Sequence, residues 1–227
     1  MSTVTKLKSY TGGRKDVISM LQVAPTRCLD IGCSNGALGA AIKEKYPAAT
    51  VVGVDYDSDF VKVAQTRLDH AVCLDLDNGG PVPKLGSFDL IILADVLEHL
   101  RNPKDVLRNI LEQNAADGCR VVISVPNVQH VTVIFNVIMG VWPERDRGIF
   151  DRTHLRWFTL RTLKNLAQSS DLDIVKIRRN YRFFDTPGLR INKLARLFAL
   201  PLLRNFFAYQ YVVLMRAKKI KPPEKSA

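Results

Sequence analysis

The sequence lacks any apolar run near the roughly 18 residues that a membrane-spanning helix needs. Its first residues, MSTVTKLKSYTGG, lack the apolar stretch of a signal peptide. The four cysteines form no CxxC pair and no Cys/His spacing of a zinc site, so we expect buried, reduced thiols. These absences predict a soluble, cytoplasmic protein.

Acidic residues are scarce only at one end of the chain. Residues 1–175 hold 20 Lys/Arg and 20 Asp/Glu, whereas residues 176–227 hold 13 and 2, so the whole net charge of +11 lies in the last quarter. The basic residues also lack the interleaved aromatics of a nucleic-acid module. The pattern predicts a neutral body with a basic end and no nucleic-acid partner.

Apolar runs alternate with helix-period stretches, which is typical of an α/β fold with a parallel sheet. Near-continuous apolar runs predict strands covered on both faces at Arg27–Ile31, Thr50–Val54, Ala71–Leu74, Phe88–Leu93 and Cys119–Val125. Helical patterns lie between them at Ala37–Tyr46, Phe60–Leu68 and Asn102–Leu111. Two later runs, Leu172–Ile177 and Tyr209–Met215, predict further strands.

Two stretches interrupt this alternation. We expect a single domain over residues 1–217, with insertions at about 127–160 and 185–207 and a basic tail at 218–227. Insertions on a regular sheet commonly carry specificity. In the second insertion, Arg190, Lys193 and Arg196 fall towards one side of a helix, so residues 188–207 are a candidate for contact with an anionic membrane.

Four carboxylates stand at the ends of successive predicted strands. They are Asp30, Asp55, Asp75 and Asp95, spaced by 25, 20 and 20 residues. The carboxyl ends of strands in an open α/β sheet line one crevice, where ligands bind. Such a crevice repels a pyrophosphate and suits a ligand with ribose hydroxyls, an amine and a positive charge.

A glycine turn, Gly32-Cys33-Ser34-Asn35-Gly36, follows the first strand. It permits positive φ angles and a close approach of ligand to backbone. Asp55 lies 19 residues beyond Gly36, about where an acid that binds a ribose is expected.

Other interpretations account for fewer of these residues. The turn matches the GxSxG elbow of hydrolases, but only about thirty residues precede it and Asp30 would charge the elbow strand. An NAD-dependent dehydrogenase fits Ser34-x-Gly36-x-x-Gly39 imperfectly and leaves Asp75 and Asp95 unexplained. Helix N-caps would explain any one acid, but not four at matching strand ends.

The run CLDIGCSNGALG…VVGVDYD…CLDLDNG…FDLIILADVLEHL…VVISVPN resembles the class I S-adenosylmethionine-dependent methyltransferases. It is similar to the ubiquinone-biosynthesis O-methyltransferases and to methyltransferase-like proteins of methionine biosynthesis. The resemblance covers roughly residues 25–180. It implies a Rossmann-like three-layer sandwich, with a seven-stranded, mostly parallel sheet that has one antiparallel strand.

The resemblance also implies a cofactor, S-adenosylmethionine. Asp30 and Gly32 would border its methionine moiety, within the turn that includes Ser34 and Gly36. Asp55, beside Tyr56, would take both ribose hydroxyls. Asp75 and the backbone N–H of Leu76 would bind the adenine, and Leu93 to Asp95 would face the methionine part. The family usually has glycine where Ser34 stands.

The sequence Asp95-Val96-Leu97-Glu98-His99 is similar to the ExxEH sequence that can hold a divalent metal in ubiquinone-type enzymes. Asp95, Glu98 and His99 share one helix face. The LEHL sequence also occurs in relatives without metal, so we favour structural or substrate-facing roles.

The first insertion follows the fifth strand, where related enzymes shape their acceptor pocket. A hydroxyl acceptor needs its proton removed, for which histidine is suited, with His154 as the first candidate and His130 as the second. Trp142, Arg147, Arg156 and Tyr10 are candidate substrate residues, and His154 and Arg156 could equally hold the insertion to the sheet.

Together these patterns predict a methyltransferase, most consistent with O-methylation of a small-molecule, saccharide or lipid-linked acceptor. The alternatives are a methyltransferase-like binding or scaffold protein without turnover and an NAD-dependent dehydrogenase.

Overall fold

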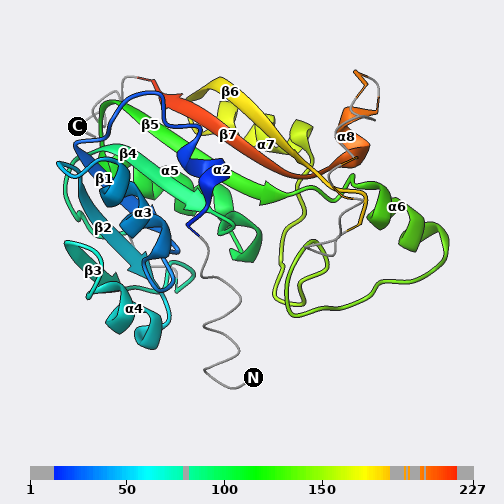
Figure 1. The fold of residues 1–227 in the computed structure, drawn as a ribbon, viewed down its shortest axis with the longest axis horizontal. Coiled ribbons are helices and arrows are strands. Elements are labelled where there is room, and N and C mark those ends of the chain that lie inside the picture. Colours follow the sequence, from blue (N-terminus) through cyan, green and yellow to red (C-terminus); the bar gives the residue numbers. More distant parts are fainter. Residues whose placement is uncertain are drawn as a thin grey trace, which may run out of the picture.

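The chain forms one seven-stranded sheet in the computed structural model (Figure 1). The structure describes residues 13–78, 82–184, 192, 194, 200, 201 and 203–218. The strand order is β3-β2-β1-β4-β5-β7-β6. The strands are β1 (Arg27–Ile31), β2 (Thr50–Asp55), β3 (His70–Cys73), β4 (Phe88–Ala94), β5 (Ala115–Pro126), β6 (Leu172–Tyr181) and β7 (Ala208–Ala217).

One strand runs against the others. β1 to β5 pair in parallel, while β7 lies between β5 and β6 and is antiparallel to both. The predicted Rossmann-like sheet, with its single antiparallel strand, is confirmed. All seven predicted strands are present, although β5 begins four residues earlier than its apolar run because the polar segment from Ala115 also joins the strand.

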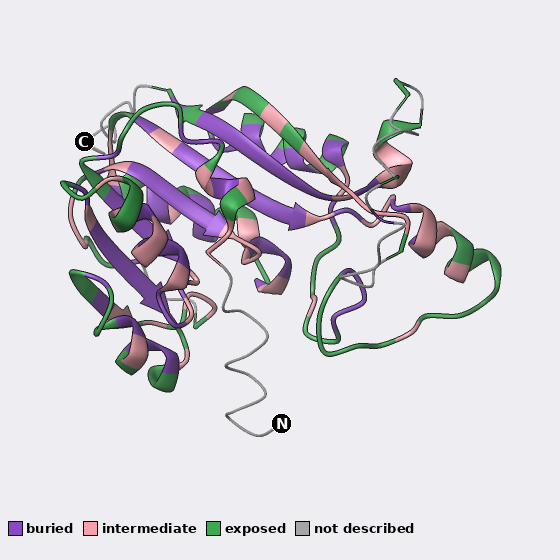
Figure 2. Ribbon diagram, in the orientation of Figure 1, coloured by how far each residue is buried: buried purple, intermediate pink, exposed green. Residues whose placement is uncertain are grey.

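Helices cover both faces of the sheet. The helices are α2 (Lys15–Ile18), α3 (Ala37–Lys45), α4 (Ser58–Ala64), η1 (Leu97–His99), α5 (Pro103–Asn114), α6 (Val131–Ile138), α7 (Leu160–Ser169) and α8 (Arg204–Phe207). α2, α3 and α4 pack on one face against side chains such as Cys28 and Val51, and α5 and α7 pack on the other against Leu29 and Val52. Neighbouring strand residues thus enter opposite cores, and the strands are buried along most of their length (Figure 2).

Local sequence explains where the helices begin. Asp57 caps α4 by accepting from the backbone N–H groups of Asp59 and Phe60, which starts the helix two residues before the predicted position. Pro103 occupies the first turn of α5, and Thr159 forms a capping box with Thr162 at α7.

The structure places three of the four cysteines in the core. Cys28, Cys33 and Cys119 are buried and free as expected, but Cys73 is exposed because β3 is an edge strand. Within the described residues, no helix is long and apolar enough to cross a membrane. Tyr10, Arg190, Lys193, Arg196 and most of residues 188–207, together with tail residues 219–227, lie outside the described part of the chain.

Candidate functional site

The ends of β1 and β2 place two carboxylates side by side. Asp30 pairs in register with Gly53, and Asp55 follows two positions further along β2. Asp30 is buried and its Oδ2 atom has no hydrogen-bond partner. Burial, together with the negative charge of Asp55, raises the pKa of Asp30 to about 7. An unpartnered buried carboxyl oxygen is costly unless a ligand supplies a donor or a positive charge.

Asp55 is held in a fixed orientation by backbone donors. Its Oδ2 accepts from the N–H of Ser34 at 2.8 Å, and its Oδ1 accepts from the N–H of Asp57 at 3.0 Å. Burial raises the pKa of Asp55, although these hydrogen bonds oppose the shift. Since each carboxylate oxygen has a second lone pair, the group can still accept from two neighbouring hydroxyls.

The turn between β1 and α3 runs in the left-handed region. Gly32, Ser34 and Gly36 have φ angles of 69°, 49° and 78°. A Cβ on Gly32 would lie 2.4 Å from Cγ2 of Val96, so this position has no room for a side chain. The φ of Ser34 is one that glycine adopts without strain, which gives a physical reason to expect glycine at this position.

The third strand contributes more exposed groups. Asp75 is exposed and its Oδ1 accepts from the N–H of Asp77 at 2.9 Å. Leu76 packs partly against the core, and Tyr56 is exposed at the end of β2. Leu93 is fully buried near the end of β4, between Ile31 of β1 and Ile123 of β5.

Asp95 is engaged within the protein. Its carboxylate accepts from Arg14 Nη1 at 2.6 Å, Ser124 Oγ at 2.7 Å and Gln210 Nε2 at 2.8 Å. Burial alone would lower the pKa of Arg14, but the negative charges of Asp95 and Asp16 outweigh it and raise that pKa. Asp95 itself has a φ of 59°, an unfavourable backbone conformation that this network holds in place.

Two of the donors to Asp95, Ser124 and Gln210, illustrate what sequence reasoning missed. Gln210 comes from the far strand β7, and Ser124 interrupts the apolar run of β5. A lone serine in such a run is the only local signal, because contacts 29 and 115 residues apart leave no spacing pattern.

A second cluster follows β4. Glu98, His99 and His154 have ligand-type atoms that all lie within 4.8 Å of one another, an arrangement that could hold a divalent cation. Asp95 is not part of this cluster, so the predicted ligand set of Asp95, Glu98 and His99 is not brought together in that form. Glu98 is buried, with Oε2 unpartnered, and burial followed by the charge of Asp95 raises its pKa well above the usual range.

His154 keeps one ring nitrogen available. Its Nδ1 donates to the carbonyl of Ile149 at 3.2 Å, which leaves the Nε2 lone pair free in the neutral tautomer. Burial, followed by the charge of His99, lowers the pKa of His154. The ring lies edge-on to His99, with centroids 4.9 Å apart, and the neutral form needed for a base is therefore favoured.

His130 is placed differently. It is fully buried at the N-cap of α6, where Nδ1 accepts from the N–H of Thr132 and Nε2 donates to the carbonyl of Arg182 at 2.8 Å. Both ring nitrogens are used, so His130 has none left for an acceptor and its evident role is to cap the helix.

The insertion is fastened to the end of β4. The backbone N–H groups of Leu155 and Arg156 both donate to the carbonyl of Glu98, at 2.8 and 3.0 Å. Arg156 also bonds through its guanidinium to the carbonyls of Leu155 and Arg101. Trp142 packs edge-on against Phe150 and Trp157, and Arg147 is exposed.

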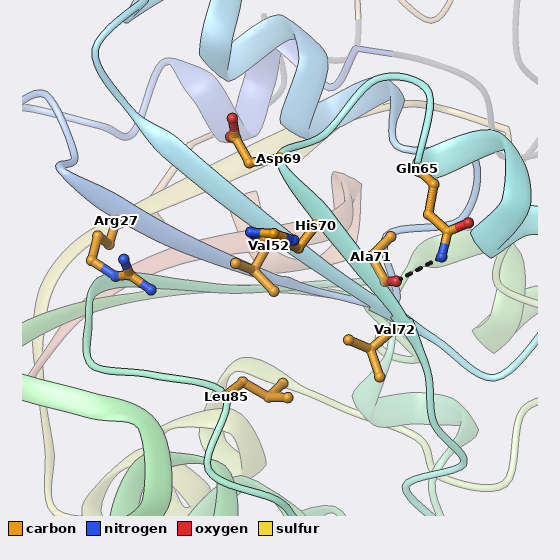
Figure 3. Close-up of a pocket in the computed structure, with 8 residues that line it drawn as sticks. All are labelled: Arg27, Val52, Gln65, Asp69, His70, Ala71, Val72 and Leu85. Carbon is orange, nitrogen blue, oxygen red and sulfur yellow. Dashed lines mark hydrogen bonds between the residues drawn. The ribbon is translucent and has the colours of Figure 1, made fainter.

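A separate surface pocket lies away from these groups (Figure 3). It is lined by residues that include Arg27, Val52, His70, Ala71 and Leu85, near the amino-terminal ends of β1 and β3. Gln65 donates to the carbonyl of Ala71 at its rim. The carboxylates and histidines described above lie at the opposite ends of the strands.

Comparison with known proteins adds a family match. Residues 11–177 match the family model described as "Methyltransferase domain". The chain is 30% identical over 99 residues to a ubiquinone biosynthesis O-methyltransferase of Xanthomonas euvesicatoria, covering 40% of each chain. It is 24% identical over 195 residues to a demethylmenaquinone methyltransferase of Thermotoga maritima, covering 81% of this chain and 85% of that one.

The matches to several relatives are partial. The aligned part spans less than half of the length of the first curated relatives, from 19% to 40%. Among solved structures, a SAM-dependent methyltransferase from Archaeoglobus fulgidus has the same fold, with a TM-score of 0.61 and 17% identity over 94% of this chain and 98% of that one.

Proposed function

Because the chain belongs to the methyltransferase domain family of class I S-adenosylmethionine-dependent enzymes, we propose that it methylates a hydroxyl oxygen of a small-molecule acceptor. The choice of a hydroxyl acceptor rests on one observation, the free Nε2 atom of His154. This atom lies beside the carboxyl ends of the strands. Relatives named as O-methyltransferases support the same choice.

The residues of the crevice fit this cofactor, which supplies an electrophilic methyl group on a sulfonium. The unpartnered oxygen of Asp30 suits a positively charged ligand, and Gly32 lets the turn after β1 pack directly against Val96. In this proposal Asp55 accepts from the two ribose hydroxyls, with Tyr56 beside them. Gly36 and Ser34 shape the turn, and Asp75 with the N–H of Leu76 binds the adenine.

Methyl transfer between bound groups is mainly a problem of positioning. Asp95 would border the methionine part, with the buried Leu93 packed beneath it in β4, and the network of Arg14, Ser124 and Gln210 would keep Asp95 rigid. His154 would take the proton of the acceptor hydroxyl at Nε2, where proton removal typically contributes about 10²–10⁴-fold to a rate.

The insertion would supply the acceptor pocket, with Trp142, Arg147 and Arg156 as candidate contacts. An aromatic face and guanidinium groups suit an acceptor with an aromatic or apolar body and an acidic group. Phenolic acids have both features, whereas saccharide acids have the acidic group and lipid-linked hydroxyls have the apolar body. The dehydrogenase alternative does not agree with the family match.

Two measurements test the proposal. Titration calorimetry with S-adenosylhomocysteine should show saturable binding by the wild type, and absence of binding would refute the cofactor assignment. A mass-spectrometric screen of hydroxyl acceptors should then show a gain of one methyl group per product. Binding without any turnover would instead support the scaffold alternative.

The role of His154 needs a separate variant. His154→Gln should lower kcat by about 10²-fold or more while leaving S-adenosylhomocysteine binding unchanged. Repeating the wild-type assay after chelation separates a base from a metal ligand, because a base retains its activity without metal. Unchanged kcat in His154→Gln would remove His154 from the mechanism.

A further inference from the structure

An uncovered apolar surface lies on α6 and the turn after it. Figure 1 shows this helix at the end of the molecule opposite β3, and Figure 2 shows much of its length and the following segment as exposed. The α6 surface, as we name it, consists of Phe135, Val137, Ile138, Met139, Val141 and Trp142, each at least 44% exposed. Several large apolar groups from one short segment are unusual on a surface that only water contacts.

α6 carries this surface, and the first half of the helix packs against the rest of the protein. Val133 is the buried residue of α6 and packs with Ile149 and Phe150 in a small core of its own. His130 caps the first turn and bonds to the carbonyl of Arg182, and Gly140 ends the segment with a φ of 69°. The helix therefore has a defined inner side at Val133, while Phe135, Val137 and Ile138 are exposed.

Both tryptophans of the chain belong to this region. Trp142 and Trp157 contact each other edge-on, with ring centroids 6.3 Å apart, and both are about half exposed. Tryptophan is enriched where proteins meet the interface of a bilayer, since its ring is apolar and its N–H remains hydrogen-bonded.

Positive charges surround the base of the helix. The guanidinium carbon of Arg182 lies 3.8 Å from the ring centroid of Tyr209, which packs against the core beneath α6. Arg204 is exposed on α8, and Arg179 bonds to Asn205 on the same helix. Arg179 and Arg182 thus lie at the end of β6 that pairs with the start of β7, where α8 and α6 are also attached, whereas Arg216 lies at the other end of β7, opposite Arg120.

The combination of exposed apolar side chains and nearby cations favours a membrane over a second protein as the partner. The exposed apolar side chains of the α6 surface suit the acyl layer of a bilayer. The cations at the base of the helix suit its anionic headgroups. In a symmetric dimer through the same helix, the cations of two copies would be brought towards each other.

We propose that the α6 surface inserts into the interfacial layer of an anionic lipid bilayer, with Arg179, Arg182 and Arg204 at the level of the headgroups. Residues 188–207, the part of the chain expected from sequence to make such contact, lie mostly outside the described residues, so the proposal rests on α6. It does not depend on the identity of the methyl acceptor.

The test uses the full chain and two kinds of vesicle: pure phosphatidylcholine, and vesicles with about a third phosphatidylglycerol. The wild type should float with the anionic vesicles and far less with the neutral ones, and raised salt should weaken the binding. Tryptophan emission should shift to shorter wavelength and be quenched by brominated lipid, because both tryptophans lie at the proposed contact.

The triple variant Phe135→Ser, Ile138→Ser and Met139→Ser should lose about tenfold or more of this vesicle affinity. Val23→Ser, an equally exposed apolar position before β1, is the matched control and should bind as the wild type does. Retained S-adenosylhomocysteine binding and an unchanged circular dichroism spectrum show that the triple variant is folded.

Failure of the wild type to bind anionic vesicles would overturn the proposal, as would equal binding by the triple variant. A concentration-dependent dimer that the triple variant abolishes, without vesicle binding, would assign the surface to self-association instead. Loss of vesicle binding in a variant that still binds S-adenosylhomocysteine separates this result from any failure of the proposed methyl transfer.

Discussion

The backbone N–H of Ser34 donates to Oδ2 of Asp55 at 2.8 Å, and so joins the turn after β1 to the end of β2. The two positions are 21 residues apart. Because the same carboxylate is the proposed ribose ligand, the conformation of the turn and the orientation of the ligand group are set together.

Replacing Asp55 with alanine should weaken S-adenosylhomocysteine binding by about ten- to hundredfold, since the paired hydrogen bonds to a charged acceptor would be lost. Calorimetric titration measures the change. Asp59→Ala removes a neighbouring but exposed acid on α4 and should leave the affinity unchanged. Equal affinities of wild type and Asp55→Ala would exclude Asp55 as the ribose ligand.

Gly32→Ala should destabilise the protein by about 1–3 kcal/mol more than Gly118→Ala, because the new methyl group would collide with Val96. The two glycines have almost the same φ, 69° and 70°, but nothing lies within 4 Å of a Cβ at Gly118. The comparison therefore isolates the collision from the backbone strain. Urea unfolding gives both values, and a Gly32→Ala,Val96→Ala double variant should recover part of the loss.

The pKa of Asp30, raised to about 7, makes the ligand-free protein less stable as the pH rises. The folded state binds a proton more tightly than the unfolded state, whose aspartate titrates near about 4, so stability falls between these two values and is constant above them. Between about pH 5 and about pH 8, the ionisation of Asp30 should lower the free energy of unfolding by about 2–3 kcal/mol.

Asp30→Asn removes that contribution and should show a correspondingly flatter dependence of the unfolding free energy on pH, measured with urea in the absence of cofactor. Other buried acids, such as Glu98, remain in both proteins and cancel in the difference. If the unfolding free energies of the two proteins depended on pH in the same way, the pKa of Asp30 would not be raised by its surroundings.

Arg14 and Asp95 should be energetically coupled. Alanine at either position breaks an ion pair of 2.6 Å that is largely shielded from water and shared with Ser124 and Gln210. A double-mutant cycle in urea unfolding should give a coupling of about 1–3 kcal/mol. The exposed pair Lys62–Asp59 provides the reference and should show much weaker coupling. Additive effects at Arg14 and Asp95 would contradict this prediction.

The pattern of apolar residues along the sequence predicted the sheet well, because buried parallel strands are continuous apolar runs. β1 has the predicted bounds, and each other strand differs only at its ends. The acids at the ends of β1 and β2 were also predictable, since chain order and strand direction place Asp30 and Asp55 at one edge.

The remainder depends on contacts between distant parts of the chain. The carboxylate of Asp95 was expected to face a ligand, yet it is held by Arg14, which is 81 residues away. His130 and His154 each follow a polar residue and precede an apolar one in sequence, and only the structure shows which ring nitrogen is free. The apolar run of α6 would ordinarily indicate burial, but Phe135, Val137 and Ile138 in the second half of that helix are exposed.

The position of β7 has a consequence for how the molecule is made. Among the strands that the structure describes, β6 at the edge of the sheet pairs with β7 alone, and β7 comes last in sequence. While the polypeptide is being synthesised, β6 therefore has no neighbour until residues 208–217 have emerged, and the edge of β5 stays open as well. Completion of the sheet thus waits for residues 208–217, and a product truncated before Ala208 would expose two unpaired strand edges prone to aggregation.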